Sequence, residues 1–174
     1  MILKDLKMRY TDKRSHFHTG LGIYNSKFYA NAGILFRTGV CLGITDYHFT
    51  IGKRYTEPQT DTLKSCKFVP TFNFKDKRDL LDHLPINTQI IGVELPNSNY
   101  HFKRAKKLHE FEWPDRCVIL LGAEDMGLND DYLDSCHDIV YVPTDINVSM
   151  NQASCGSIVL YSRYLSLMNK GFIS

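Results

Sequence analysis

The chain has no apolar run long enough to cross a membrane, and charged residues are spread through its first 20 positions, where a signal peptide would be apolar. It also has no Cys-x-x-Cys pair, because its five cysteines, at positions 41, 66, 117, 136 and 155, are widely spaced. These absences argue against a membrane span, a disulfide framework and a zinc site. We therefore expect a soluble, cytoplasmic protein that holds no metal and keeps its cysteines reduced in its core.

Internal repeats, low-complexity tracts and an interdomain linker are also missing. The 174 residues, of which 43% are hydrophobic and 23% are charged, suffice for one well-packed core and are few for two domains. We expect one globular domain over residues 20–174, preceded by a basic lead-in over residues 1–19.

The net charge of +2 conceals an asymmetry along the chain. Residues 1–116 carry 19 of the 21 Lys and Arg, for a balance of +7, whereas residues 117–174 have a balance of −5. A basic surface suits a polyanion such as nucleic acid, but an ordinary solvated face explains the same charges equally well. The basic residues concerned are Lys4, Lys7, Arg9, Lys13, Arg14, Lys53, Arg54, Lys103, Arg104, Lys106 and Lys107.

Strand and helix patterns alternate along the chain, which predicts an α/β fold with a largely parallel sheet. Several of the expected strands are continuous apolar runs, as is typical of a sheet that is covered on both faces. The expected strands are 20–24, 47–52, 68–74, 89–95, 117–123 and 138–143. The expected helices are 30–43, 76–84, 102–111, 129–135 and 150–169.

Three of these strands end in small and polar residues. The strand at 117–123 runs into GAEDMGL, the strand at 138–143 into PTDINVSMN, and the strand at 89–95 into LPNSN. Ligands of open α/β sheets bind where parallel strands end, and glycines there allow a close backbone approach. We therefore expect a pocket for a small organic cofactor, although no G-x-G-x-x-G follows the first strand to indicate a dinucleotide.

An arginine interrupts the apolar pattern of the first expected helix. The residues Ile34, Leu35, Thr38, Cys41 and Leu42 recur at the three- and four-residue spacing of a helix face, and Arg37 lies among them. Taken alone, Arg37 is best explained as a side chain whose stem lies along the core and whose charge reaches solvent.

Three blocks of the sequence, NAGILFRTG, ILLGAEDMGL and VPTDINVSMNQASCGSIVLY, resemble the three motifs of the SpoU (TrmH-like) branch of the SPOUT RNA methyltransferases. The resemblance covers nearly everything from residue 20 onward. It implies a SPOUT-type α/β knot fold, with a C-terminal trefoil knot near residues 122–160, and a homodimer formed through the first and last helices. It also implies S-adenosylmethionine as cofactor and methyl transfer to a ribose 2′-hydroxyl of tRNA or rRNA.

The resemblance also assigns roles to residues. Those expected at the catalytic site are Asn31, Arg37, Glu124, Ser149 and Asn151, with Asn147 as an alternative to Asn151. Those expected to hold the cofactor are Glu94, Leu95, Gly122, Gly127, Val142 and Met150. The expected RNA contacts are Lys53, Arg54, Lys103, Arg104, Lys106 and Lys107, aided by the loop at 52–65. The alternative is a protein that has the SPOUT fold but no catalytic activity and acts as an RNA-binding or adaptor protein.

Overall fold

The computed structural model describes residues 16–95, 97–146 and 148–173. Its strands are β1 (His18–Tyr24), β2 (Tyr47–Ile51), β3 (Thr71–Phe74), β4 (Gln89–Val93), β5 (Ala105–Lys107), β6 (Arg116–Leu121) and β7 (Asp138–Tyr141). Its α-helices are α2 (Tyr29–Leu42), α3 (Lys77–Asp82), α4 (Asn99–Arg104), α5 (Asp130–Ser135) and α6 (Gln152–Asn169). Short 3₁₀ helices, η1 (Ser65–Lys67) and η2 (Leu108–Glu110), complete the set within the described ranges.

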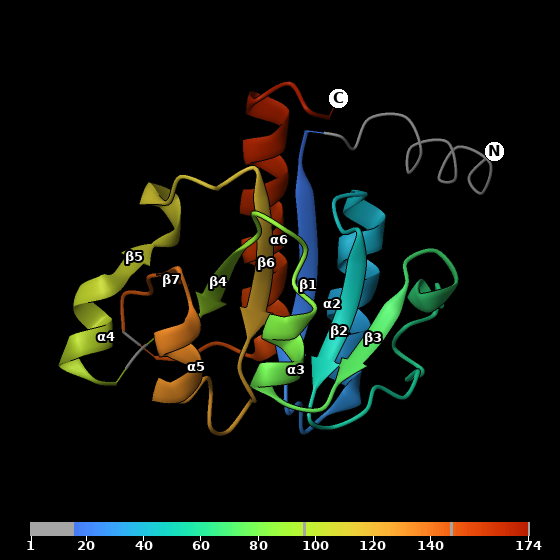
Figure 1. Cartoon of the computed structure of the whole chain (residues 1–174), viewed down its shortest axis with the longest axis horizontal. Helices are drawn as coiled ribbons and strands as arrows, with labels where there is room; N and C mark the ends of the chain where they lie inside the picture. The colour runs from blue at the N-terminus through green and yellow to red at the C-terminus, as the bar shows by residue number, and fades with distance from the viewer. Residues whose placement is uncertain (1–15, 96, 147, 174) are drawn as a thin grey trace.

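All the strands join one sheet in the order β3-β2-β1-β6-β4-β7-β5, and every neighbouring pair is parallel. This confirms the predicted α/β class and parallel sheet. In Figure 1, α2 and α6 lie behind the sheet, while α3 and α5 lie in front of it. The helix layers explain why the central strands are apolar on both faces.

The core is divided between the two faces of the sheet. Alternate residues of β6 illustrate this division, because Ile119 packs with α2 and α6 whereas Val118 packs with α3 and α5. Among the described residues, no helix combines the length and the apolar character that a membrane crossing needs.

The buried face of α2 differs from the predicted one. The core-facing residues are Ala32, Leu35, Phe36, Gly39 and Val40, whereas the side chain of Ile34 is 40% exposed. Cys41, also predicted on the core face, is exposed as well. Arg37 therefore does not interrupt the core face, because it lies on the exposed face of the helix.

The predicted helix over 102–111 is wrong. Ser98 accepts a hydrogen bond from the backbone of His101 and so begins α4 earlier, and the chain then forms β5 and η2. The short strand β5 lies at the edge of the sheet and carries two lysines, a common device against edge-to-edge pairing. The predicted strands at 68–74 and 138–143 are shortened to β3 and β7, beside Pro70 and Pro143, which lack a backbone N–H.

The cysteines are all free thiols, but they are not all in the core. Cys117 and Cys136 are buried, as predicted, whereas Cys41 and Cys66 are exposed. Cys155 is half-buried, and burial followed by the nearby charge of Glu94 raises the pKa of its thiol to about 11. Cys155 therefore remains a neutral thiol at physiological pH.

Candidate functional site

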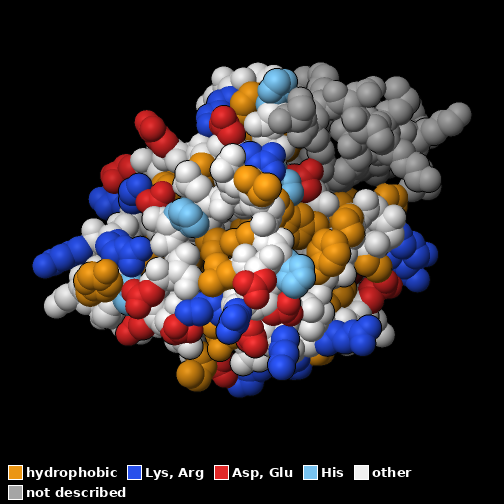
Figure 2. All heavy atoms as spheres, in the orientation of Figure 1, with side chains coloured by type: hydrophobic (Ala, Val, Ile, Leu, Met, Phe, Trp, Pro, Cys, Tyr) orange, Lys and Arg blue, Asp and Glu red, His pale blue; other side chains and the backbone are white. Residues whose placement is uncertain are grey.

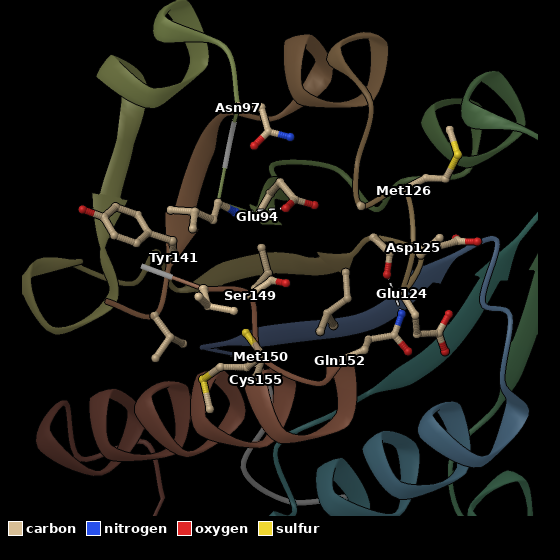
Figure 3. Close-up of a pocket in the computed structure, with 18 residues that line it drawn as sticks. Glu94, Asn97, Glu124, Asp125, Met126, Tyr141, Ser149, Met150, Gln152 and Cys155 are labelled. Atoms are coloured by element: carbon tan, nitrogen blue, oxygen red, sulfur yellow. Dashed lines mark hydrogen bonds between the residues drawn. The ribbon is translucent and has the colours of Figure 1, made fainter. Parts of the chain in front are cut away.

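A cavity of about 340 Å³ opens where β4, β6 and β7 end, as the sequence predicts for a cofactor pocket (Figure 3). Its walls come from the segments that follow these three strands and from the first turn of α6. All six residues predicted to hold the cofactor line it, namely Glu94, Leu95, Gly122, Gly127, Val142 and Met150. Two of the predicted catalytic residues, Glu124 and Ser149, line it as well.

Two glycines shape the loop between β6 and α5. A Cβ at Gly122 would lie 2.2 Å from the carbonyl carbon of Gly127, so no side chain fits there. Gly127 has a φ of +62°, a backbone conformation that other residues rarely adopt. Backbone hydrogen bonds in both directions between Ala123 and Gly127 then close the loop. The glycines thus leave backbone groups, without side chains, facing the cavity.

Glu94 fixes this loop to the end of β4. Its carboxylate accepts hydrogen bonds from the backbone of Leu128 at 2.7 Å and of Leu95 at 3.0 Å. Burial raises the pKa of Glu94, and the two backbone hydrogen bonds only partly offset this effect. The side chain of Glu94 therefore holds two walls of the cavity together, a role that the sequence alone did not indicate.

Glu124 joins the same loop to the start of α2. Its carboxylate accepts backbone hydrogen bonds from Lys27 at 2.7 Å and from Phe28 at 3.2 Å, and a further one from the hydroxyl of Ser26 at 3.1 Å. Phe28 is the N-cap residue of α2 and offers no capping side chain, so Glu124 supplies the anion that a helix N-terminus favours.

The hydrogen bonds also set the protonation state of Glu124. Partial burial raises its pKa, but the bonds from the Lys27 backbone, the Asn31 side chain and the Phe28 backbone outweigh burial and lower it. Glu124 is therefore ionised at neutral pH and surrounded by donors. A carboxylate in this state is a poor general base, but its hydrogen bonds hold the loop after β6 against the start of α2.

Asn31 connects the first of the three blocks to the other two. Its amide nitrogen donates to Glu124 at 2.8 Å, and its amide oxygen accepts from the side chain of Asn151 at 3.3 Å. Asn151 also caps α6, since its side-chain oxygen accepts from the backbone of Ala153 and Ser154. Asn147, the predicted alternative to Asn151, lies outside the described residues.

Arg37 lies apart from this network. Residues six positions apart on a helix are separated by about 9 Å along its axis and point to different sides. Asn31 therefore contacts Glu124 and Asn151 instead of Arg37. Arg37 is exposed, does not line the cavity, and has no ion pair or side-chain hydrogen bond with any residue that the structure describes.

Gln152 is a cavity residue that the sequence analysis missed. It is buried at the first position of α6, and its amide nitrogen donates to the carbonyl of Gly122. Its amide oxygen is buried and has no hydrogen-bond partner within the described part of the chain. A buried acceptor without a donor on a cavity wall fits a polar ligand. The available signal was a glutamine at the start of an apolar helix.

The predicted RNA-contacting residues fall into two groups. Lys106 pairs with Asp138 at 2.6 Å, and Arg104 and Lys107 also lie within 4 Å of carboxylates. Lys53, Arg54 and Lys103, in contrast, are exposed and pair with no carboxylate of the described residues. Among these six residues, unpaired charge therefore lies at two places: Lys53 and Arg54, of which Lys53 contacts the start of α2, and Lys103 on α4. Within the part of the chain that the structure describes, no three His, Cys, Asp or Glu side chains form a cluster that could hold a metal ion.

Structures of similar fold have been solved for several RNA-modifying proteins. One, solved for the 2-OH methylation of C/U34 on tRNA, has a TM-score of 0.73 and 22% identity, covering 88% of this chain and 98% of that chain. The A. aeolicus TrmH/SpoU tRNA modifying enzyme has a TM-score of 0.75 and 20% identity, covering 97% and 85%. AviRb from Streptomyces viridochromogenes, solved with AdoMet, has a TM-score of 0.75 and 16% identity, covering 88% and 59%.

These structural similarities show that the fold is shared. Whether the chain belongs to a protein family is decided by comparing its sequence with family models. A search of curated proteins finds no significant match. The model of the SpoU rRNA Methylase family, however, matches residues 21–161, which include all three sequence blocks and the whole cavity. The chain therefore belongs to the SpoU rRNA methylase family, as its three blocks predicted.

Proposed function

We propose that this SpoU-family protein transfers the methyl group of S-adenosylmethionine to a ribose 2′-hydroxyl of a tRNA or rRNA, with the cofactor in the cavity at the ends of β4, β6 and β7. The network of Asn31, Glu124 and Asn151 carries the proposal. It joins residues of all three blocks beside that cavity, so the blocks act as one site.

The residues of the cavity fit this cofactor. Gly122 and Gly127 leave backbone groups accessible, and the unpaired oxygen of Gln152 suits an amino group. Leu95, Val142 and Met150 offer apolar surface for a flat ring. When bound, S-adenosylmethionine supplies an electrophilic methyl group on a sulfonium. The carboxylates of the cavity segments favour such a cation.

Arg37 remains our candidate for the reaction centre. A guanidinium stays protonated, so we assign it to binding the target phosphate or stabilising the oxyanion that develops as the 2′-hydroxyl loses its proton. Ser149, exposed at the cavity, is placed to contact the ribose. Asn31, Glu124 and Asn151 then position the N-terminal ends of α2 and α6 beside the site.

The exposed position of Arg37 favours a site that is shared between two copies of the chain. Because Arg37 does not line the cavity of its own chain, we propose a homodimer in which it faces the cavity of a second copy. The exposed faces of α2 and α6 provide apolar surface for this contact. On α6 these residues are Ile158, Tyr161, Leu165 and Met168, each at least 40% exposed. The trefoil knot near 122–160 and the single domain over 20–174 stay predictions.

The substrate class rests on similarity. The name of the family refers to rRNA. In contrast, the similar structure that is matched over 98% of its length was solved for the methylation of a tRNA. We favour a compact tRNA loop, recognised by the domain's own surface. Free thiols, including exposed Cys41 and Cys66, agree with a cytoplasmic location.

One experiment tests the function directly. Total RNA is incubated with the protein and S-adenosylmethionine that carries a labelled methyl group, and the nucleosides are then mapped by mass spectrometry. A labelled 2′-O-methyl nucleoside at one position names the substrate, whereas label on a base contradicts the proposal. Calorimetry with S-adenosylmethionine and its demethylated product tests the adaptor alternative, because an adaptor needs to bind neither.

A further inference from the structure

An aromatic ring stands exposed at the edge of the proposed reaction centre. The side chain of Phe28 is 56% exposed at the start of α2. Its backbone N–H donates to Glu124, which lines the cavity. The position of Phe28 relative to the cavity is therefore fixed by the hydrogen bonds that also cap α2.

Cationic side chains lie over the Phe28 ring and over the ring of its neighbour Tyr29. The ammonium of Lys27 lies 5.9 Å from the centroid of the Phe28 ring, and the ammonium of Lys53 lies 4.6 Å from that of Tyr29. Lys53 also donates to the backbone carbonyl of Lys27 at 3.3 Å. Lys27 pairs with Asp125, but Lys53 and the adjacent Arg54 have no carboxylate partner in the described ranges.

The loop after β2 holds these cations in place. The hydroxyl of Thr60 donates to the carbonyl of Ala30 at 2.9 Å, and Pro58 packs so closely on Gly33 that no Cβ fits between them. Buried Asp61 accepts hydrogen bonds from the backbone and hydroxyl of Ser65. The loop is therefore packed on α2, and its basic end stays near Phe28 and Tyr29.

An exposed aromatic ring beside unpaired cations matches the chemistry of an unpaired nucleotide. A base stacks on an aromatic face, and its phosphate attracts cationic side chains. Figure 2 shows that Lys and Arg side chains gather along the lower edge of the molecule, the edge at which β1, β2 and β6 end in Figure 1. A protein partner would favour a broader apolar patch with fewer charges.

We propose that Phe28, Tyr29, Lys53 and Arg54 form a subsite for an unpaired nucleobase of the RNA substrate, next to the nucleotide that is methylated. The base stacks on Phe28, and its phosphate lies against Lys53 and Arg54. This subsite rests on the proposed RNA methyltransferase function. It makes a single-stranded loop, in place of a continuous helix, the class of RNA that the enzyme accepts.

Binding measurements test the subsite without any methyl transfer. The probes are a single-stranded oligouridylate of eight nucleotides and a chain of equal length made of abasic ribose phosphates. The wild-type protein should bind the oligouridylate more tightly. Phe28→Ala should weaken oligouridylate binding by about 5- to 150-fold, the range that loss of base stacking gives, and leave abasic binding unchanged. Phe28→Trp should retain the preference.

Control variants separate stacking from charge. Phe72→Ala removes a ring of similar exposure, 49%, from the edge strand β3 and should change neither affinity. Replacing both Lys53 and Arg54 with Ala should weaken the two probes equally, since both carry phosphates.

Two results would overturn the subsite. One is a Phe28→Ala protein that binds both probes like the wild type. The other is a Phe28→Ala protein that loses only its dimeric state in sedimentation, since Phe28 would then belong to a contact between copies. A wild-type protein that prefers the base but methylates no RNA would retain the subsite and refute the proposed function, so the two failures are distinguishable.

Discussion

Asn31 of α2 donates a 2.8 Å hydrogen bond to Glu124, a residue 93 positions later in the chain. Asn31 also accepts a hydrogen bond from Asn151, so its side chain is bonded to side chains of both other sequence blocks. Asn31 is buried, so its removal leaves polar partners without a donor or an acceptor. This bond fastens the start of α2 to Glu124, a residue of the cavity wall.

We expect Asn31→Ala to lower the free energy of unfolding by about 1–3 kcal/mol, because it leaves partly buried partners unsatisfied. Urea denaturation of Asn31→Ala, Glu124→Gln and the double variant measures the coupling. A coupling energy of about 0.5 kcal/mol or more is expected for residues in contact. Strictly additive effects would show that the two side chains do not act together.

The two cavity glutamates should respond to pH in opposite directions. Hydrogen bonds lower the pKa of Glu124 below its ordinary 4.5, so the unfolded chain binds more protons there. Compared with Glu124→Gln, the wild type should lose stability as the pH falls below about 4.5. Burial raises the pKa of Glu94, so compared with Glu94→Gln the wild type should gain stability as the pH falls.

Thermal unfolding of the wild type and both variants, from pH 7 to pH 3, measures these differences. Each variant serves as the control for the other, since both replace a cavity carboxylate with an amide. Differences of the same sign for the two variants would contradict the opposite pKa shifts assigned to burial of Glu94 and to the hydrogen bonds of Glu124.

Gly127→Ala should weaken cofactor binding at least tenfold. A Cβ there would lie 2.3 Å from a carboxylate oxygen of Glu94, and the φ of +62° adds backbone strain. Gly171→Ala is the matched control, because Gly171 has a φ of +71° but no atom within 4 Å of the added Cβ. Calorimetry with S-adenosylmethionine should show at least a tenfold weaker affinity for Gly127→Ala only. Equal losses in both variants would assign the effect to backbone strain.

Arg37→Ala should eliminate methylation and leave the affinity for S-adenosylmethionine nearly unchanged, because its proposed role is toward RNA. Arg37→Lys should restore little activity if two parallel hydrogen bonds are needed. Arg78→Ala, on exposed α3, controls for loss of a surface charge. Methylation assays measure the activity of each variant, and calorimetry measures its affinity for S-adenosylmethionine. Loss of cofactor binding in Arg37→Ala would show that Arg37 has a structural role.

Salt dependence should distinguish the two basic groups. Replacing Lys53 and Arg54 with Ala should reduce the slope of log affinity against log salt by about 1.4, or about 0.7 for each contact to single-stranded RNA. Replacing Lys106 and Lys107 should change the slope less, because both are paired with carboxylates. Titrations of RNA binding over a range of salt decide this. A larger change for the second pair would place the RNA on β5.

Much of the architecture could be predicted because buried parallel strands appear as continuous apolar runs. The three strand ends that form the cavity were predicted for the same reason. The buried face of α2 was not, because hydrophobicity alone does not distinguish Ile34, which is exposed, from Gly39, which is buried. β5 escaped detection because Lys106 and Lys107 carry no strand signal.

The contacts that hold the site together could not be predicted from the sequence either. The bond from Asn31 to Glu124 and the pair of Lys106 with Asp138 join segments that the fold brings together over long separations. Spacing along a chain reveals local pairs only, such as those one helix turn apart. The motif blocks identified which residues matter, and the fold determined what each one contacts.

The position of β1 in the sheet has a consequence for biosynthesis. β1 lies between β2 and β6, and His18 pairs opposite Arg116. A nascent chain that has not yet reached residue 116 leaves one edge of β1 without a partner. Such late pairing slows folding and exposes strand edges to aggregation, so we expect this protein to depend on chaperones while it leaves the ribosome.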